Sequence, residues 1–349
     1  MPEPVHPQLS RAPHGGPGNA PFTGLDFSVN TNPYGPNPLL LSAVQNADHA
    51  HYPDPDYFAV KESLGRWHGV EAGCVVPAVG ASELLHRLAR AYLRPGDRAL
   101  SVLSPFGEFG RAVTLAGGKL NVVRSGEAAE KVQPGVKLVY LGHPHNPTGQ
   151  HFQPDQLNAL KRACERADAL LIVDMAYSPF LALPSPAPSS HTVLLHSPGK
   201  AHGLVGARPA YAVALPAVAT ALHNLAPAWA LPAGTAALLQ ALPDAQDFLH
   251  QTLPEVTRNA AQLARTLSEL AEVEHHGAPY MTVRVGNAVG TAAGLLAQGL
   301  KVRDCASYGQ PEYIRVSARR PGENEVLVRA MRNLPLYSVA ASGRLEEPR

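Results

Sequence analysis

The chain has 349 residues, 29 basic and 28 acidic side chains and a formal net charge of +1. This balance excludes a basic face for nucleic acid and an acidic tail. Three cysteines, Cys74, Cys164 and Cys305, match neither a zinc site nor a disulfide framework, so we expect no metal centre and a reduced, cytoplasmic protein. Residues 1–13 lack the basic start and apolar core of a signal peptide, so we expect none, and no apolar run approaches the roughly 20 residues of a membrane span.

Short apolar runs alternate with helix-period segments from about Glu71 onward. Buried strands that are bounded by turns and separated by helices predict an α/β domain with a mainly parallel sheet. The expected elements, in chain order, are a helix at 82–93, a strand at 97–103, a helix at 108–115, strands at 120–123 and 136–141, a helix at 154–167, and strands at 170–173 and 192–195.

The last third of the chain has a different pattern. Residues 213–242 are rich in Ala and Leu and interrupted by prolines, which predicts broken helices. A helix at 252–270, strands at 281–285 and 313–317, and helices at 288–297 and 323–332 predict a smaller α+β domain. We therefore expect an N-terminal arm with part of the small domain at 1–45, a large domain at 46–245, a small domain at 246–335 and a tail at 336–349.

A glycine-rich loop directly follows the expected strand at 192–195. It contains Ser197, Lys200 and Arg208, with the lysine three residues after the serine and eight before the arginine. A lysine amine can act as nucleophile and base when it is partly desolvated or lies near other cations. A lysine in a glycine-rich turn is usually just solvated, so the loop is informative only together with other segments.

Two further polar segments come earlier, in Asn146-Pro147-Thr148-Gly149 and in Asp174-Met175-Ala176-Tyr177. Asp174 ends an apolar strand, at the edge where α/β sheets bind ligands. Gly80-Ala81-Ser82 opens the expected helix at 82–93, whose first backbone amides favour an anion. Taken alone, Asp174 could simply cap a helix, and the segments at 146–149 and 80–82 could be ordinary turns.

Together the segments resemble those of fold-type I enzymes that use pyridoxal phosphate, and the resemblance covers essentially the whole chain. The chain is similar to the histidinol-phosphate aminotransferase group of the class I/II aminotransferases. The resemblance implies that Lys200 binds the cofactor aldehyde, Asp174 the pyridine nitrogen, and Tyr177 and Asn146 the phenolic oxygen. It also implies that Gly80, Ala81, Ser82, Ser197 and Arg208 hold the phosphate, that Phe109 stacks on the ring, and that Tyr52 reaches the phosphate of a partner subunit in a homodimer.

The same resemblance suggests substrate contacts. Arg315 corresponds to the arginine that grips the substrate carboxylate, and an arginine suits a bidentate clamp. His14, Asn32 and Arg303 are hypothetical further contacts, with His14 and Arg303 facing a substrate phosphate.

Within this group, His14-Gly15-Gly16 and the run Arg303-Asp304-Cys305-Ala306-Ser307-Tyr308 look closer to threonine-phosphate decarboxylase. The leading hypothesis is therefore decarboxylation of L-threonine O-3-phosphate to aminopropanol phosphate, in cobalamin biosynthesis. The alternative is an aminotransferase for histidinol phosphate or a related amino acid. A non-catalytic pyridoxal-phosphate sensor is a remote alternative, because we expect no DNA-binding module before the fold. A nicotinamide-binding enzyme is also disfavoured, because this sequence lacks the Gly-x-Gly-x-x-Gly turn that such an enzyme needs.

Several positions depart from the family pattern. Gly199 replaces a hydroxyl residue that often precedes the lysine, and Pro209 follows Arg208 where an aliphatic residue is usual. His143 and His145 stand where relatives commonly carry small residues or asparagine. Since these positions surround the expected cofactor and substrate, they leave the identity of the substrate open.

Overall fold

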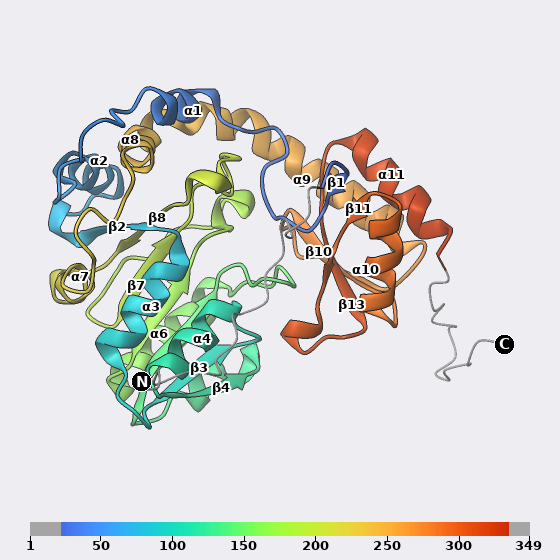
Figure 1. Ribbon diagram of the computed structural model, residues 1–349. Helices are drawn as coiled ribbons and strands as arrows, with labels where there is room; N and C mark the ends of the chain where they lie inside the picture. Colours follow the sequence, from blue (N-terminus) through green and yellow to red (C-terminus); the bar gives the residue numbers. More distant parts are fainter. Residues whose placement is uncertain (1–21, 335–349) are drawn as a thin grey trace, which may run out of the picture. The chain divides into compact units, whose positions relative to one another are not determined.

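The computed structural model describes residues 22–334 (Figure 1). These residues form two compact units. The first comprises Gly35–Asn146 and His151–His250; the second comprises 22–34, Pro147–Gln150 and 251–334. Within the described residues, no helix has both the length and the apolar character that crossing a membrane requires.

A seven-stranded sheet forms the centre of the first unit, and its strand order is β2-β8-β7-β6-β5-β3-β4. All neighbouring strands are parallel except those beside β8, which runs antiparallel to both β2 and β7. The strands are β2 (Val75–Val79), β3 (Arg98–Val102), β4 (Lys119–Val123), β5 (Val136–Gly142), β6 (Leu170–Asp174), β7 (Thr192–His196) and β8 (Pro209–Val213).

Alternate residues of these strands enter two separate hydrophobic cores, as the two-residue period of a strand requires. In β6, for example, Leu171 and Val173 join one core, whereas Leu170 and Ile172 join the other. The first core is covered by α1 (Pro38–Gln45), α2 (Phe58–His68), α5 (Ala128–Lys131), α6 (Pro154–Ala167) and α8 (Ala233–Ala241), and the second by α3 (Ala81–Tyr92), α4 (Gly107–Leu115) and α7 (Pro216–His223).

The second unit contains a four-stranded antiparallel sheet in the order β12-β13-β10-β9. Its strands are β9 (Val273–Glu274), β10 (Tyr280–Arg284), β12 (Arg303–Asp304) and β13 (Tyr313–Ser317). A short parallel pair joins β1 (Leu25–Asp26) to β11 (Leu300–Lys301). Helices α10 (Ala288–Ala297) and α11 (Pro321–Arg332) belong to this unit, and α9 (Gln246–Ser268) begins in the first unit and continues into it.

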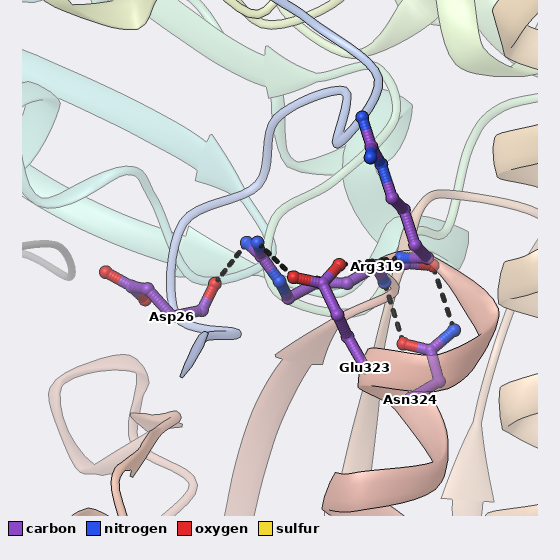
Figure 2. A network of polar contacts seen from close by, with 5 residues as sticks. Asp26, Arg319, Glu323 and Asn324 are labelled. Atoms are coloured by element: carbon purple, nitrogen blue, oxygen red, sulfur yellow. Dashed lines mark hydrogen bonds and ion pairs between the residues drawn. The ribbon is translucent and has the colours of Figure 1, made fainter. Parts of the chain in front are cut away.

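Arg319 ties three parts of the second unit together (Figure 2). Its guanidinium donates to the backbone carbonyl of Asp26 in β1 and to the carboxylate of Glu323 in the first turn of α11. Its backbone N–H donates to the side chain of Asn324, whose amide nitrogen donates back to the carbonyl of Arg319. These bonds satisfy backbone groups at the start of α11 and anchor the short strand β1, which has few ladder bonds of its own.

The structure confirms the α/β class with a mainly parallel sheet and every helix and strand predicted above, with ends shifted by a few residues. The largest shift is in α9, which was predicted from residue 252 and begins at Gln246, with Pro254 inside the helix. Helices α1, α2 and α5 and the short strands β1, β9, β11 and β12 were not predicted. Strands β2 and β8 were also missed, because each contains a proline and β8 lies in the stretch interpreted as loop and broken helix.

Candidate functional site

One pocket of the first unit gathers most of the residues that the sequence singled out. Its lining includes the residues that end or follow β2, β5, β6 and β7, whose carboxyl ends lie at one edge of the sheet. β8 runs the opposite way, so the residue before it lies at the same edge. The predicted residues found in the lining are Gly80, Ala81, Ser82, Asn146, Asp174, Tyr177, Ser197, Lys200 and Arg208.

Gly80 and Arg208 meet at the start of α3. Gly80 has a φ of +83°, and a Cβ at this position would run into the Arg208 guanidinium. Arg208 is itself in the left-handed region, with a φ of 55°, although it is not a glycine. The first turn of α3 offers N–H groups that have no helical partner. An arginine side chain laid against a helix N-terminus makes a cradle for an anionic group, such as a phosphate.

Lys200 lies in a tight loop between β7 and β8. Its backbone N–H donates to the carbonyl of Ser197, and its Nζ lies 5.9 Å from the centre of the Tyr177 ring. Gly199 is required by this loop, since a Cβ there would lie 2.9 Å from the carbonyl oxygen of Leu204. Close packing of the backbone thus accounts for the glycine that replaces a hydroxyl residue before the lysine.

Asp174 is buried at the end of β6. Its Oδ2 accepts the hydroxyl of Tyr140 at 2.8 Å, and its Oδ1 accepts the backbone N–H of Ala176 at 3.1 Å. Burial raises the pKa of Asp174, whereas the bonds from Tyr140 and Ala176 and the charge of Lys200 act in the opposite direction. Tyr140 lines the same pocket. It was not predicted as a site residue, because a tyrosine in an apolar strand indicates only a core residue.

The aromatic residue of the pocket differs from the predicted one. Phe109 was expected to stack on the cofactor ring, but it is fully buried in the core and does not line the pocket. Its ring instead stacks on Tyr140, with centroids 4.9 Å apart. Phe106, three residues earlier, lies at the N-terminus of α4 and lines the pocket. The two phenylalanines share one short segment, and only the position of the helix start distinguishes them.

Tyr52 lies outside the pocket and is 78% exposed. Its ring stacks on that of Trp229, which is 45% exposed, with centroids 4.6 Å apart. Tyr57 braces the segment that carries Trp229, because its hydroxyl donates to the carbonyl of Leu231 and accepts from the N–H of the same residue. The result is a stacked aromatic pair held at the surface of the first unit.

The predicted substrate residues Arg303 and Arg315 lie side by side in the second unit. They face each other across strands β12 and β13, and their exposed fractions are 8% and 5%. Arg303 donates to the Ser307 hydroxyl, and Arg315 donates to the backbone carbonyl of Ser28. Arg303 also forms an ion pair with Asp304, with 3.7 Å between Nη1 and Oδ2. Like charges directly opposite one another in a sheet are unfavourable, so two arginines beside one carboxylate still favour a further anion.

Asn32, the other predicted contact in this unit, is engaged by its neighbours. Its amide donates to the Thr252 hydroxyl and accepts from the N–H of Tyr34. Asn30, two residues earlier and not predicted, is 2% exposed, and its side-chain nitrogen and oxygen have no hydrogen-bond partner among the described residues. A buried amide without partners is rare and marks a position suited to a polar ligand. His14 lies outside the described residues.

His143 and His145 frame the turn that carries Asn146, and the imidazole of neither lines the pocket. Burial lowers the pKa of His143 to about 4, and its Nδ1 accepts the N–H of Phe152 at 3.3 Å. His145 bonds through Nε2 to the carbonyl of Ser104 at 2.9 Å, in the loop before α4. These histidines therefore pack behind the pocket and hold its loops.

Comparisons with known proteins identify the family of the chain. Residues 23–331 match the family model described as aminotransferase class I and II. The chain belongs to the class I and II aminotransferases. This membership confirms the fold class, the enzyme class and the pyridoxal-phosphate cofactor expected from the sequence.

Among curated relatives of this family, histidinol-phosphate aminotransferase 1 of Thiobacillus denitrificans is 29% identical over 345 residues, which cover 93% of this chain and 88% of that protein. Histidinol-phosphate aminotransferase of Halobacterium salinarum is 30% identical over 337 residues, covering 88% of this chain and 90% of that protein. These relatives favour the aminotransferase alternative over the decarboxylase that the sequence placed first.

Solved structures show the same fold. L-Threonine-O-3-phosphate decarboxylase from Porphyromonas gingivalis has a TM-score of 0.81 at 20% identity, with 88% of this chain and 98% of that chain covered. Histidinol-phosphate aminotransferase from Sinorhizobium meliloti, in complex with pyridoxal-5'-phosphate, has a TM-score of 0.79 at 22% identity, with 88% and 91% covered.

The pocket of this class I and II aminotransferase fits pyridoxal phosphate on its own chemistry. The cradle of Arg208 and the α3 N-terminus suits a phosphate, and Lys200 offers an amine for an aldehyde. Asp174 offers a buried carboxylate for a pyridinium nitrogen, and Phe106 offers an aromatic face.

Proposed function

We propose that the protein is a pyridoxal-phosphate-dependent aminotransferase whose substrates carry an anionic group besides the reacting amine, with histidinol phosphate as the representative. The arginine pair of β12 and β13 is the observation that supports this substrate class, since two nearly buried guanidinium groups lie opposite each other. The names of the curated relatives support the reaction. We assign the cofactor to the first unit and the anion-binding arginines to the second.

Each site residue has a task in this proposal. Arg208, Ser197 and the first turn of α3 bind the cofactor phosphate, and Asp174 holds a proton on the pyridine nitrogen. Asn146 and Tyr177 bind the phenolic oxygen. The bound cofactor supplies an aldehyde for the substrate amine and a conjugated ring that accepts electrons from the α-carbon. With the cofactor bound, the Lys200 amine would move a proton at that carbon.

Arg315 and Arg303 orient the substrate by binding its anionic groups. Arginine forms bidentate bonds to carboxylate and phosphate, so two adjacent arginines discriminate strongly against uncharged amines. A phosphate monoester has about two negative charges near neutral pH, and a dicarboxylic amino-group donor has two carboxylates. Either substrate of an aminotransferase would therefore complement the positive charge that Arg303 and Arg315 retain beside Asp304.

A second candidate is decarboxylation of L-threonine O-3-phosphate. This substrate has one carboxylate and one phosphate, and the pair of Arg303 and Arg315 suits both groups at once. Arg303 is also the first residue of the 303–308 run noted in the sequence. The two reactions share the cofactor and the lysine. They differ in which bond of the α-carbon breaks, and tenfold selectivity between bonds needs only about 1.4 kcal/mol.

A product assay separates the candidates. Purified protein loaded with pyridoxal phosphate is incubated with histidinol phosphate and 2-oxoglutarate, or with L-threonine O-3-phosphate and no keto acid, and the products are identified by mass spectrometry. We expect glutamate in the first mixture and none with the Lys200→Ala variant. Steady formation of aminopropanol phosphate in the second mixture, with no glutamate in the first, would instead establish the decarboxylase.

We further propose that the enzyme works as a cytoplasmic homodimer in which Tyr52 of each subunit reaches the cofactor phosphate of the other. The exposed stack of Tyr52 on Trp229 supports a contact surface in this region. Cys74, Cys164 and Cys305 are buried and form no disulfide, which supports a reducing compartment.

A further inference from the structure

Tyr140 lies on β5 beside the carboxylate that faces the cofactor pocket. Its hydroxyl donates to Oδ2 of Asp174 at 2.8 Å, and an ionised carboxylate can only accept, so the direction of this bond is fixed. The second oxygen of Asp174 accepts the N–H of Ala176 at 3.1 Å. One side-chain donor and one backbone donor thus hold the two oxygens separately, and this sets the plane of the carboxyl group.

The phenol ring of Tyr140 is held in place by packing. Only 3% of the residue is exposed, and its ring stacks on the fully buried Phe109 at 4.9 Å, with an interplanar angle of 20°. Pairing of β5 with β6 places Gly142 opposite Asp174 and Tyr140 opposite Ile172. The hydroxyl therefore reaches Asp174 diagonally across two neighbouring strands, and neither strand can shift without disturbing the sheet.

The charge of Asp174 depends on these contacts. Burial disfavours a carboxylate and raises the pKa of Asp174, and the bond from Tyr140 is the strongest of the contacts that lower it. The titratable groups that act on Asp174 are Tyr140 from β5 and Lys200 from the loop after β7. Lys200 is the residue that would bind the cofactor aldehyde, whereas the Tyr140 hydroxyl bonds directly to Asp174.

We propose that Tyr140 is a positioning residue of the cofactor site, whose hydroxyl keeps the Asp174 carboxylate ionised and oriented toward the pyridine nitrogen. The inference rests on the proposed function and concerns how this chain maintains the charge that the cofactor requires. It assigns to an apparently structural strand residue a direct influence on cofactor affinity and on the dependence of that affinity on pH.

The test is a titration of cofactor-free protein with pyridoxal phosphate between pH 5 and pH 8, followed by absorbance and by quenching of tryptophan fluorescence. Tyr140→Phe keeps the ring and its stacking but loses the hydroxyl. Because the pKa of Asp174 then rises, the variant should lose affinity on acidification at a higher pH than the wild type does. At the acid end we expect affinity roughly tenfold or more below that of the wild type.

Two further variants make the result specific. Tyr211→Phe removes a hydroxyl that is also buried and bonded, to Nε2 of His68 at 2.9 Å, but that lies outside the cofactor pocket. The affinity of this variant for pyridoxal phosphate should depend on pH as that of the wild type does. In an Asp174→Asn background, Tyr140→Phe should cause no additional loss, since the group through which it acts has no charge to protect.

The possible outcomes distinguish this inference from the proposed function. Wild-type pH dependence in Tyr140→Phe, an equal shift in Tyr211→Phe, or a full additional loss in the Asp174→Asn background would each overturn the role of Tyr140 while leaving the proposed function intact. If the wild-type protein bound no pyridoxal phosphate at all, both would fail. Urea unfolding of each variant, measured in parallel, reports any general loss of stability. The comparison of Tyr140→Phe in the wild-type and Asp174→Asn backgrounds does not depend on such a loss, because a loss of stability would affect both backgrounds alike.

Discussion

Gly80 is a position at which a side chain would collide with the Arg208 guanidinium. Its φ of +83° suits glycine, and a Cβ would occupy the space of the arginine side chain. The position therefore needs glycine for two reasons, the backbone conformation and the close approach. Pro209, the residue after Arg208, is compatible with its place because a proline is tolerated at the first position of a strand.

Replacing Gly80 with alanine should displace Arg208 and weaken the binding of pyridoxal phosphate by roughly tenfold to a hundredfold, the effect of losing one charge-assisted bond. The measurement is a cofactor titration of the variant. Gly73→Ala is the matched control, because a Cβ at Gly73 meets no atom within 4 Å and its φ is not in the left-handed region. Equal affinity in the two variants would show that the cradle of Gly80 and Arg208 does not bind the cofactor.

Among the helices and strands, the sequence predicted best those with a long, unbroken pattern of apolar residues. Strands β5 and β6 are nearly continuous apolar runs, and α6 has a clear apolar face, so both types of element were found. β8 was missed because it begins with a proline and has no long apolar run, and its place in the sheet comes from pairing with β2 and β7. Tertiary pairing of that kind leaves no local signal.

The residues of the candidate site also fall into those that the sequence predicted and those that it did not. Lys200 and Asp174 were predicted because the residue types, order and spacing of their segments resemble those of fold-type I enzymes. Phe109 was predicted in place of the pocket residue Phe106, because the sequence does not show where α4 begins. Asn30 and Tyr140 were missed, since only three-dimensional contacts distinguish an amide without partners or a bonded phenol from core residues. Sequence alone therefore indicated the reactive groups, and the structure added the residues that orient them.

Strands β12 and β13 bring Arg303 and Arg315 together, and this pairing leads to a prediction about the substrate. Arg303→Gln should raise the KM for a phosphorylated substrate by roughly a hundredfold, since a buried bond to a charged group is lost, and should leave the affinity for pyridoxal phosphate unchanged. Steady-state kinetics and a cofactor titration measure the two effects.

Arg284→Gln is the control on the same sheet. Arg284 lies on β10 and forms exposed ion pairs with Glu272 and Glu312, which contribute little to stability. We expect its KM to match that of the wild type. If both variants raised KM equally, the effect would come from the general charge of the second unit, and the specific role of the β12–β13 pair would be excluded.

For the whole molecule, a shared active site predicts complementation between two inactive subunits. Lys200→Ala lacks the reactive amine, and Tyr52→Ala lacks the side chain proposed to reach the partner's cofactor phosphate; each alone should form an inactive or severely impaired dimer. In a mixed dimer, one site carries both defects and the other carries neither, because a two-fold axis exchanges the contributions of the subunits.

Co-expression with two different affinity tags and purification on both isolates the mixed dimer, whose activity should be about half that of the wild-type dimer. Dimers that carry Lys200→Ala and Tyr52→Ala in the same chain, paired with a wild-type chain, are the matched control: both of their sites contain one defect, so they should be inactive. The reverse pattern, an inactive mixed dimer and a half-active control, would mean that Tyr52 serves the site of its own subunit. Equal activity of the two arrangements would mean that Tyr52 serves neither site. Failure to recover any doubly tagged protein would mean that the stack of Tyr52 on Trp229 does not lie at a contact between two copies of this chain.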